Sequence, residues 1–114
     1  MQTVKINNKP YEVPELNFHH SKVMEQMGLP LDGMMSKQYI FTAVSAFVSI
    51  VANVPPEIAD HLVEQHILGG GNIEDIYKSY VTAINESGFF KKLLHLDEQV
   101  EKKTAKKPST AKTE

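Results

Sequence analysis

Residues 55–94 read PPEIADHLVEQHILGGGNIEDIYKSYVTAINESGFFKKLL and carry the clearest structural pattern in the chain. Pro56 suits the first turn of a helix, where the missing N–H would have no partner anyway. Gly69 to Gly71 end that helix, because glycine adopts positive φ without a Cβ penalty. Between these limits the apolar side chains recur at helical spacing, which predicts an amphipathic helix: Ile58, Leu62, Val63 and Ile67.

A second helix is predicted directly after the glycine run. Asn72 is placed to accept from the amides of the first turn, while Glu74 and Asp75 face the positive end of the helix dipole. Ser87-Gly88 stops the pattern. The apolar stripe of this helix comprises Ile73, Ile76, Tyr77, Tyr80 and Ile84.

The N-terminal residues have the pattern of a β-hairpin. Val4 and Ile6, then Tyr11 and Val13, alternate with polar residues on either side of Asn-Asn-Lys-Pro at 7–10. Asparagine tolerates the left-handed conformation that a tight turn requires. Because a lone hairpin is marginal in water, we expect it to pack on helices or to pair with another chain.

Two further helices are expected before residue 55. Asn17 caps a short helix that ends at Gly28, and the segment Gly28 to Gly33 is predicted to be a loop. Residues 38–54 contain no charged side chain, which predicts a helix central to the core. The alternatives are a partly exposed partner face and a membrane span. A span needs about 20 apolar residues, and this segment is shorter and carries several polar side chains.

The composition changes after Leu96. Asp97 to Lys103 is expected to extend a helix, while Thr104 to Glu114 lacks large apolar side chains and is expected to be disordered. We therefore predict a mainly α domain at 1–96, with about four helices and a short N-terminal β-hairpin. A helix extension and a disordered basic C-terminal tail follow at 97–114.

Charge and composition narrow the classes of function. Residues 1–90 hold five lysines and ten acidic residues, whereas residues 91–114 hold seven lysines and four acidic residues. The chain has no arginine, the preferred reader of guanine edges, and its body is acidic. These features argue against nucleic-acid recognition. The absence of cysteine excludes thiolate catalysis and disulfides, and suits a reducing compartment.

None of the polar constellations predicts catalysis. His61 and His66 are five residues apart, whereas a helical metal-binding pair needs a spacing of three or four. The glycine run lacks the Lys-Ser/Thr of a phosphate loop. Acidic neighbours such as Asp60 and Glu64 lie on predicted exposed faces. We therefore expect no enzyme, no cofactor and no metal site.

The segment from Phe89 to Leu94 is the candidate partner-binding site. Two adjacent aromatic residues cannot share one helical face, and the flanking Lys91 and Lys92 need water. In one interpretation a third helix docks one side of this segment on the core. In the other, part of the cluster meets an apolar helix of a client or a second copy of the chain. The candidate residues are Phe89, Phe90, Leu93 and Leu94.

The order of these elements resembles the small tail assembly chaperones of long-tailed bacteriophages. In that family a proline-started acidic helix, a glycine-rich turn, a second helix and an ending like E-S-G-F-F-K-K-L recur. The resemblance covers roughly residues 3–96 and is strongest at 55–94; the opening TVKINNKPYEV looks like the family's hairpin. The three consecutive glycines depart from the pattern. The chain would correspond to the short form of proteins that also exist in a frameshifted long form.

The resemblance implies a role without catalysis. Such a phage or prophage chaperone would hold the hydrophobic tape-measure protein soluble while tail-tube subunits polymerise around it. It would act in the cytoplasm of the bacterial host and be absent from the mature virion, with no role for membranes. The alternative is a structural tail or head–tail connector component retained in the virion. A small helical DNA-binding regulator is disfavoured by the acidic body and the missing arginine.

Overall fold

The computed structural model describes residues 2–95. This part of the chain is mainly helical with an N-terminal antiparallel hairpin, as the sequence predicted. The helix extension expected at Asp97 to Lys103 and the disorder expected at Thr104 to Glu114 lie outside the described residues. The elements are β1 (Thr3–Ile6), β2 (Lys9–Glu12), α1 (Phe18–Gln26), α2 (Ile40–Ala52), α3 (Pro56–Leu68), α4 (Ile73–Glu86) and α5 (Gly88–Leu93), with single 3-10 turns at Leu31–Gly33 and Lys37–Tyr39.

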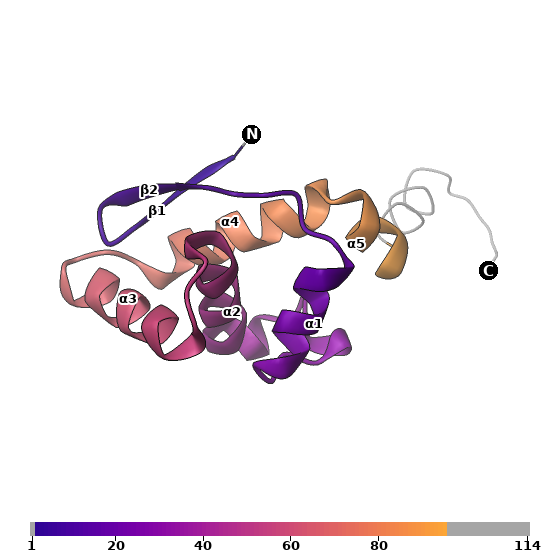
Figure 1. Ribbon diagram of the computed structural model, residues 1–114, viewed down its shortest axis with the longest axis horizontal. Coiled ribbons are helices and arrows are strands. Elements are labelled where there is room, and N and C mark those ends of the chain that lie inside the picture. Colours follow the sequence, from indigo (N-terminus) through magenta and orange to yellow (C-terminus); the bar gives the residue numbers. More distant parts are fainter. Residues whose placement is uncertain (1, 96–114) are drawn as a thin grey trace.

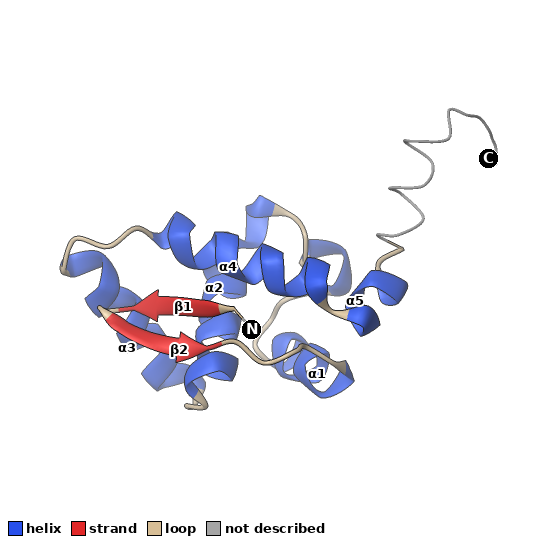
Figure 2. Cartoon of the chain, turned by 90° about the horizontal axis from the view of Figure 1, so that it is seen from above, coloured by secondary structure: helices blue, strands red, loops and turns tan. Residues whose placement is uncertain are grey.

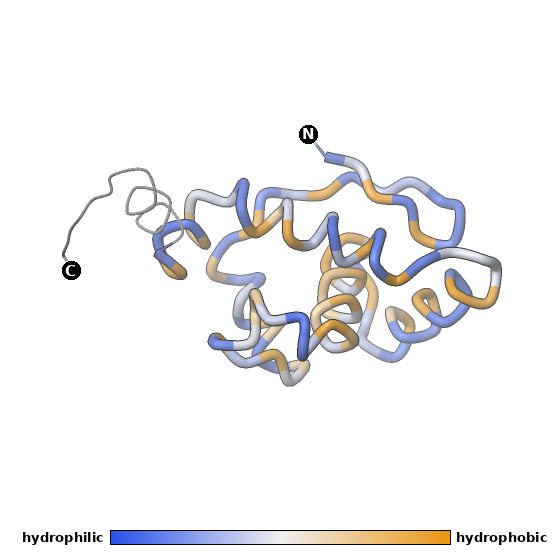
Figure 3. Tube along the Cα trace, turned by 180° about the vertical axis from the view of Figure 1, so that it is seen from behind, coloured by the Kyte–Doolittle hydropathy of each residue, from blue (hydrophilic) through white to orange (hydrophobic). Residues whose placement is uncertain are grey.

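Helix α2 lies at the centre, surrounded by the other elements (Figure 1). Most of its side chains from Ala43 to Ser49 are buried, so the prediction of a core helix is confirmed. The rings of Phe47 and Tyr80 meet edge to face at 5.9 Å, which joins α2 to α4. A continuous line of hydrophobic residues follows α2, whereas α3 and α4 alternate between apolar and polar positions (Figure 3).

The hairpin covers one side of the helices (Figure 2). Its turn is Asn7-Asn8, and both residues adopt positive φ, 54° and 67°. Lys9 and Pro10 were expected in the turn, but they pair with Ile6 and Lys5. This difference arises because two left-handed asparagines already complete a tight turn. Pro10 is tolerated because it lies in an edge strand. Val4 and Ile6 are buried on the helix side, while Thr3 and Lys5 are exposed.

The caps expected for α1 and α4 are both present. Asn17 accepts from the backbone N–H of His19 at 3.0 Å, and Asn72 accepts from that of Glu74 at 2.8 Å. Gly28 follows α1 with φ +97°, and Gly70 follows α3 with φ +98°. Only glycine adopts these dihedrals without strain, so both helix ends were readable from the sequence.

Helix α3 is buried less deeply than its apolar stripe predicted. Ala59 is its only buried residue among those described, and Leu62 and Val63 are half-buried against α2. Ile58 and Ile67 lie on the two shoulders of this contact and remain exposed, together with Leu68. The stripe is therefore wider than the surface that α2 offers to it.

The helices of the described part also bear on membrane insertion. Between residues 2 and 95, no helix is by itself long and apolar enough to cross a membrane. The segments Lys37–Ala52 and Pro56–Leu68 reach the necessary length and hydropathy only together, across a bend of 107°.

Candidate functional site

A single buried serine fixes the orientation of α5. The Ser87 hydroxyl donates to the carbonyl of Leu16 at 2.6 Å and accepts from the N–H of Phe90 at 3.1 Å. It therefore caps α5 and ties that helix to the segment before α1. Since a buried hydroxyl without partners is costly, this pair of hydrogen bonds holds α5 in one position against the core.

This position divides the predicted partner-binding cluster into an inner and an outer half. Phe90 is fully buried in the core, so it is not available to a partner in the folded chain. Leu94 is half-buried and packs against the core. Phe89 and Leu93 lie one turn apart in the neighbouring row of α5; Phe89 is half-buried and, like Leu94, partly packed against the core, and Leu93 is 36% exposed. Of the two adjacent aromatic residues, Phe90 therefore belongs to the core and Phe89 extends toward the surface.

Phe18, which was not among the predicted partner-binding residues, completes the outer half. Its side chain is 63% exposed, and its ring centroid lies 6.0 Å from that of Phe89 in an edge-to-face arrangement. The Phe89 ring in turn lies 5.1 Å from that of Phe90. An aromatic series therefore runs from the core to the surface. We name its outer part, Phe18, Phe89 and Leu93, the aromatic patch.

A sequence signal for Phe18 existed but was incomplete. The Asn17 cap makes Phe18 the first residue of α1, so no earlier turn of the helix covers its side chain. Which side of α1 meets α5 depends on the Ser87–Leu16 bond, which joins residues 71 positions apart. Periodicity within one helix carries no information about such a contact.

The charges around the aromatic patch are mainly basic. Lys91 and Lys92 precede Leu93 on α5, and Lys22 lies one turn after Phe18 on α1. The two histidines after Phe18 belong to the cap of α1: Nδ1 of His20 accepts from the backbone N–H of Asn17 at 3.0 Å. Burial, and to a smaller extent the neighbouring His19, lowers the pKa of His20 below its ordinary value. This shift favours the neutral imidazole that the cap requires.

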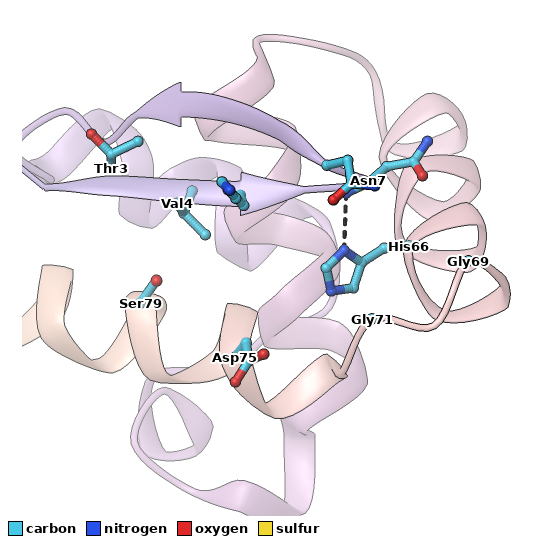
Figure 4. A pocket seen from close by; sticks show the side chains of 10 residues that line it. Thr3, Val4, Asn7, His66, Gly69, Gly71, Asp75 and Ser79 are labelled. Carbon is cyan, nitrogen blue, oxygen red and sulfur yellow. Dashed lines mark hydrogen bonds between the residues drawn. The ribbon is translucent and has the colours of Figure 1, made fainter.

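A second histidine, His66, lies in a polar groove of about 320 Å³ between β1 and α4 (Figure 4). Its Nδ1 accepts from the backbone N–H of Asn7 at 2.9 Å, and Nε2 lies 3.3 Å from the carbonyl oxygen of Asn72. Gly71 packs directly on the ring, where an added Cβ would approach Nε2 to 2.4 Å. These contacts assign His66 a structural role between hairpin, α3 and α4.

Two of the other polar groups singled out in the sequence have structural partners. Asp60 accepts from the Ser45 hydroxyl, and Glu74 pairs with Lys37 at 3.0 Å. Within residues 2–95, no group of three or more His, Cys, Asp or Glu side chains is arranged to hold a metal ion. What the aromatic patch offers chemically is an apolar surface beside cations. No protein-family model, curated protein or solved structure matches this chain.

Proposed function

We propose that this chain is an assembly chaperone that binds an apolar helix of a client through the aromatic patch. The observation that supports the proposal is the exposure of Phe18 on α1 and of Leu93 on α5, on either side of Phe89, with α5 held against the core by Ser87. A folded domain gains nothing in its own stability by leaving a large aromatic ring in water. Contiguous exposed apolar side chains are typical of a surface that meets another protein.

The resemblance to phage tail assembly chaperones identifies the client that we propose. It is the tape-measure protein, a long and hydrophobic chain, and the tail-tube subunits are the second partner. The chaperone would act in the cytoplasm of the bacterial host without catalysis. Burial of a Phe or Leu side chain contributes roughly 1.5–3 kcal/mol each, before the cost of association is subtracted. Two such side chains suit a transient contact, which tube subunits in excess would displace by mass action.

Co-expression with the tape-measure protein of the same phage or prophage tests this proposal. The wild-type chain should keep the client in the soluble fraction. Phe18→Ser with Leu93→Ser should keep the helical circular dichroism spectrum yet let the client precipitate. A matched control, Leu31→Ser with Leu68→Ser, removes two exposed leucines elsewhere and should retain the activity. A folded aromatic-patch variant that still solubilises the client would exclude this patch as the binding surface.

One observation favours the alternative of a virion component that adds a strand to a neighbouring subunit. Hydrogen-bonded pairs alternate in an antiparallel ladder. The N–H of Val13 donates to the carbonyl of Gln2 at 2.9 Å, so Gln2 and Val13 form a hydrogen-bonded pair. Thr3–Glu12 and Lys5–Pro10 are therefore non-hydrogen-bonded pairs, whose backbone groups point away from the partner strand. Backbone groups of Thr3 and Lys5 then point away from β2 into the polar groove, so an added strand would have to enter between β1 and α4.

Mass spectrometry of purified virions separates the two functions. A chaperone is released before the tail is complete and should be absent from the particles. A connector or tail component should be present in fixed stoichiometry with the tube protein. Stoichiometric recovery of this chain from purified particles would replace the chaperone proposal with the structural one.

A further inference from the structure

Phe41 is the most exposed large apolar side chain among the described residues, at 76%. It lies in the first turn of α2, a helix whose middle is otherwise buried in the core. It takes no part in the aromatic patch, which is built from α1 and α5. The first turn of the central helix thus presents a phenyl ring to solvent at a place that the proposed function does not use.

Phe41 lines an open groove of about 390 Å³ between the end of α1, the first half of α2 and the start of α3. Met27 lines the same groove, and its flexible thioether side chain adapts to apolar partners of different shape. Within the groove, the Ser45 hydroxyl donates to the Asp60 carboxylate. The lining residues are Gln26, Met27, Phe41, Thr42, Ser45, Pro56 and Asp60.

The surface beside this groove is acidic. Helix α3 contains no lysine or arginine but three acidic side chains. Asp60 lines the groove, and Glu57 and Glu64 lie within about one turn of it on the same helix; all three are exposed. A groove in which Phe41 and Met27 lie beside acidic side chains of α3 favours a partner in which apolar and basic side chains are adjacent.

We propose that this groove, the Phe41 groove, binds an amphipathic helix of a partner protein that carries an apolar stripe flanked by lysine or arginine. A helix fits better than a small molecule, because the groove is open and Phe41 stands at its mouth instead of being enclosed. The charge preference is opposite to that of the aromatic patch, where lysines flank the apolar residues. The chain therefore has two binding surfaces of opposite charge, and this second surface does not depend on the identity of the client above.

A pair of synthetic helical peptides tests the Phe41 groove. Both carry leucine at i, i+3, i+4 and i+7, and the opposite face is lysine in one and glutamate in the other. The lysine peptide should bind the full chain in calorimetry and shift the amide NMR signals of Met27, Thr42 and Ser45. Phe41→Ser should weaken binding by ~10-fold or more, as expected for a central aromatic anchor. Because Phe41 is exposed, this variant should remain folded by circular dichroism.

Two controls separate a specific groove from general attraction to an acidic protein. Leu68→Ser removes a comparably exposed apolar side chain, 72% against 76% for Phe41, that belongs to neither surface, and it should leave the affinity unchanged. Glu57→Gln with Glu64→Gln should weaken binding and reduce its salt dependence. Equal affinity for the glutamate peptide would overturn the proposal. So would full affinity in folded Phe41→Ser, or chemical-shift changes confined to residues outside the groove.

Discussion

The imidazole of His66 accepts a hydrogen bond from the backbone N–H of Asn7 at 2.9 Å, across 59 positions of sequence. The bond joins the hairpin turn to the end of α3. With Nδ1 as acceptor, the ring proton of the neutral imidazole lies on Nε2, toward the carbonyl of Asn72. One side chain therefore connects three segments that periodicity alone would treat as independent.

Replacement of His66 should loosen the hairpin turn locally. His66→Leu removes an acceptor and a donor, and each hydrogen bond contributes about 1 kcal/mol. We expect faster hydrogen exchange at the amide of Asn7, with little change in the amides of α2. His61→Leu, on an exposed part of the same helix, is the control and should leave the Asn7 amide protected. Unchanged exchange at Asn7 in the His66 variant would contradict the structural role.

Alanine at Gly71 should destabilise the domain, because the new Cβ would meet the His66 ring at 2.4 Å. The expected loss is about 1–3 kcal/mol, as for other overpacked sites, measured by denaturant titration. Gly88→Ala is the matched control, since a Cβ added there would have no atom within 4 Å. Alanine at this position should be neutral or should raise the free energy of unfolding by up to about 1 kcal/mol, because it lowers the conformational entropy of the unfolded chain. Equal effects of the two changes would refute the close contact at Gly71.

The two phenylalanines of α2 should respond oppositely to truncation. Phe47 is fully buried against Tyr80, so Phe47→Ala should lower the free energy of unfolding by about 3–5 kcal/mol. Phe41→Ala, on the same helix but exposed, should change it by less than about 0.5 kcal/mol. Thermal or urea unfolding of both variants measures the difference. A near wild-type Phe47→Ala would place this face of α2 at an interface instead of in the core.

Acid should weaken the cap of α1 through His20. Its pKa is lowered in the folded chain, chiefly by burial, so the unfolded chain takes up the proton first. The free energy of unfolding should therefore decrease as the pH falls below the unfolded value of about 6.5. The decrease ends below the folded pKa. His20→Gln retains a side chain that can cap the helix but does not titrate. This part of the pH dependence should vanish in that variant. If it persists, a titrating group other than His20 causes it.

Local chemistry predicted the elements well, whereas contacts between elements were beyond its reach. Asn17 and Asn72 were identified as caps because a short side-chain oxygen beside a helix start has few other uses. By contrast, the candidate cluster Phe89 to Leu94 could not be divided by sequence alone. Phe89 and Leu93 form one apolar row on α5, and Phe90 and Leu94 form another. The hydrogen bond from Ser87 to Leu16 orients the helix so that Phe90 points inward. The exposure of Phe18 and Phe41 was missed for the same reason, because it depends on how the neighbouring elements pack around each side chain.

The bond between Ser87 and Leu16 also sets an order of events during synthesis. Its donor is made 71 residues after its acceptor, which at ~5–20 residues per second corresponds to a delay of several seconds. Phe18 is thus translated early, but Phe89 and Leu93 reach their places beside it only after α5 has been made. A nascent chain that stops before α5 carries an unpaired Phe18 and an unfinished surface. The client-binding surface that we propose is therefore complete only once α5 has been made, and Phe90 of the same helix completes the core beneath it.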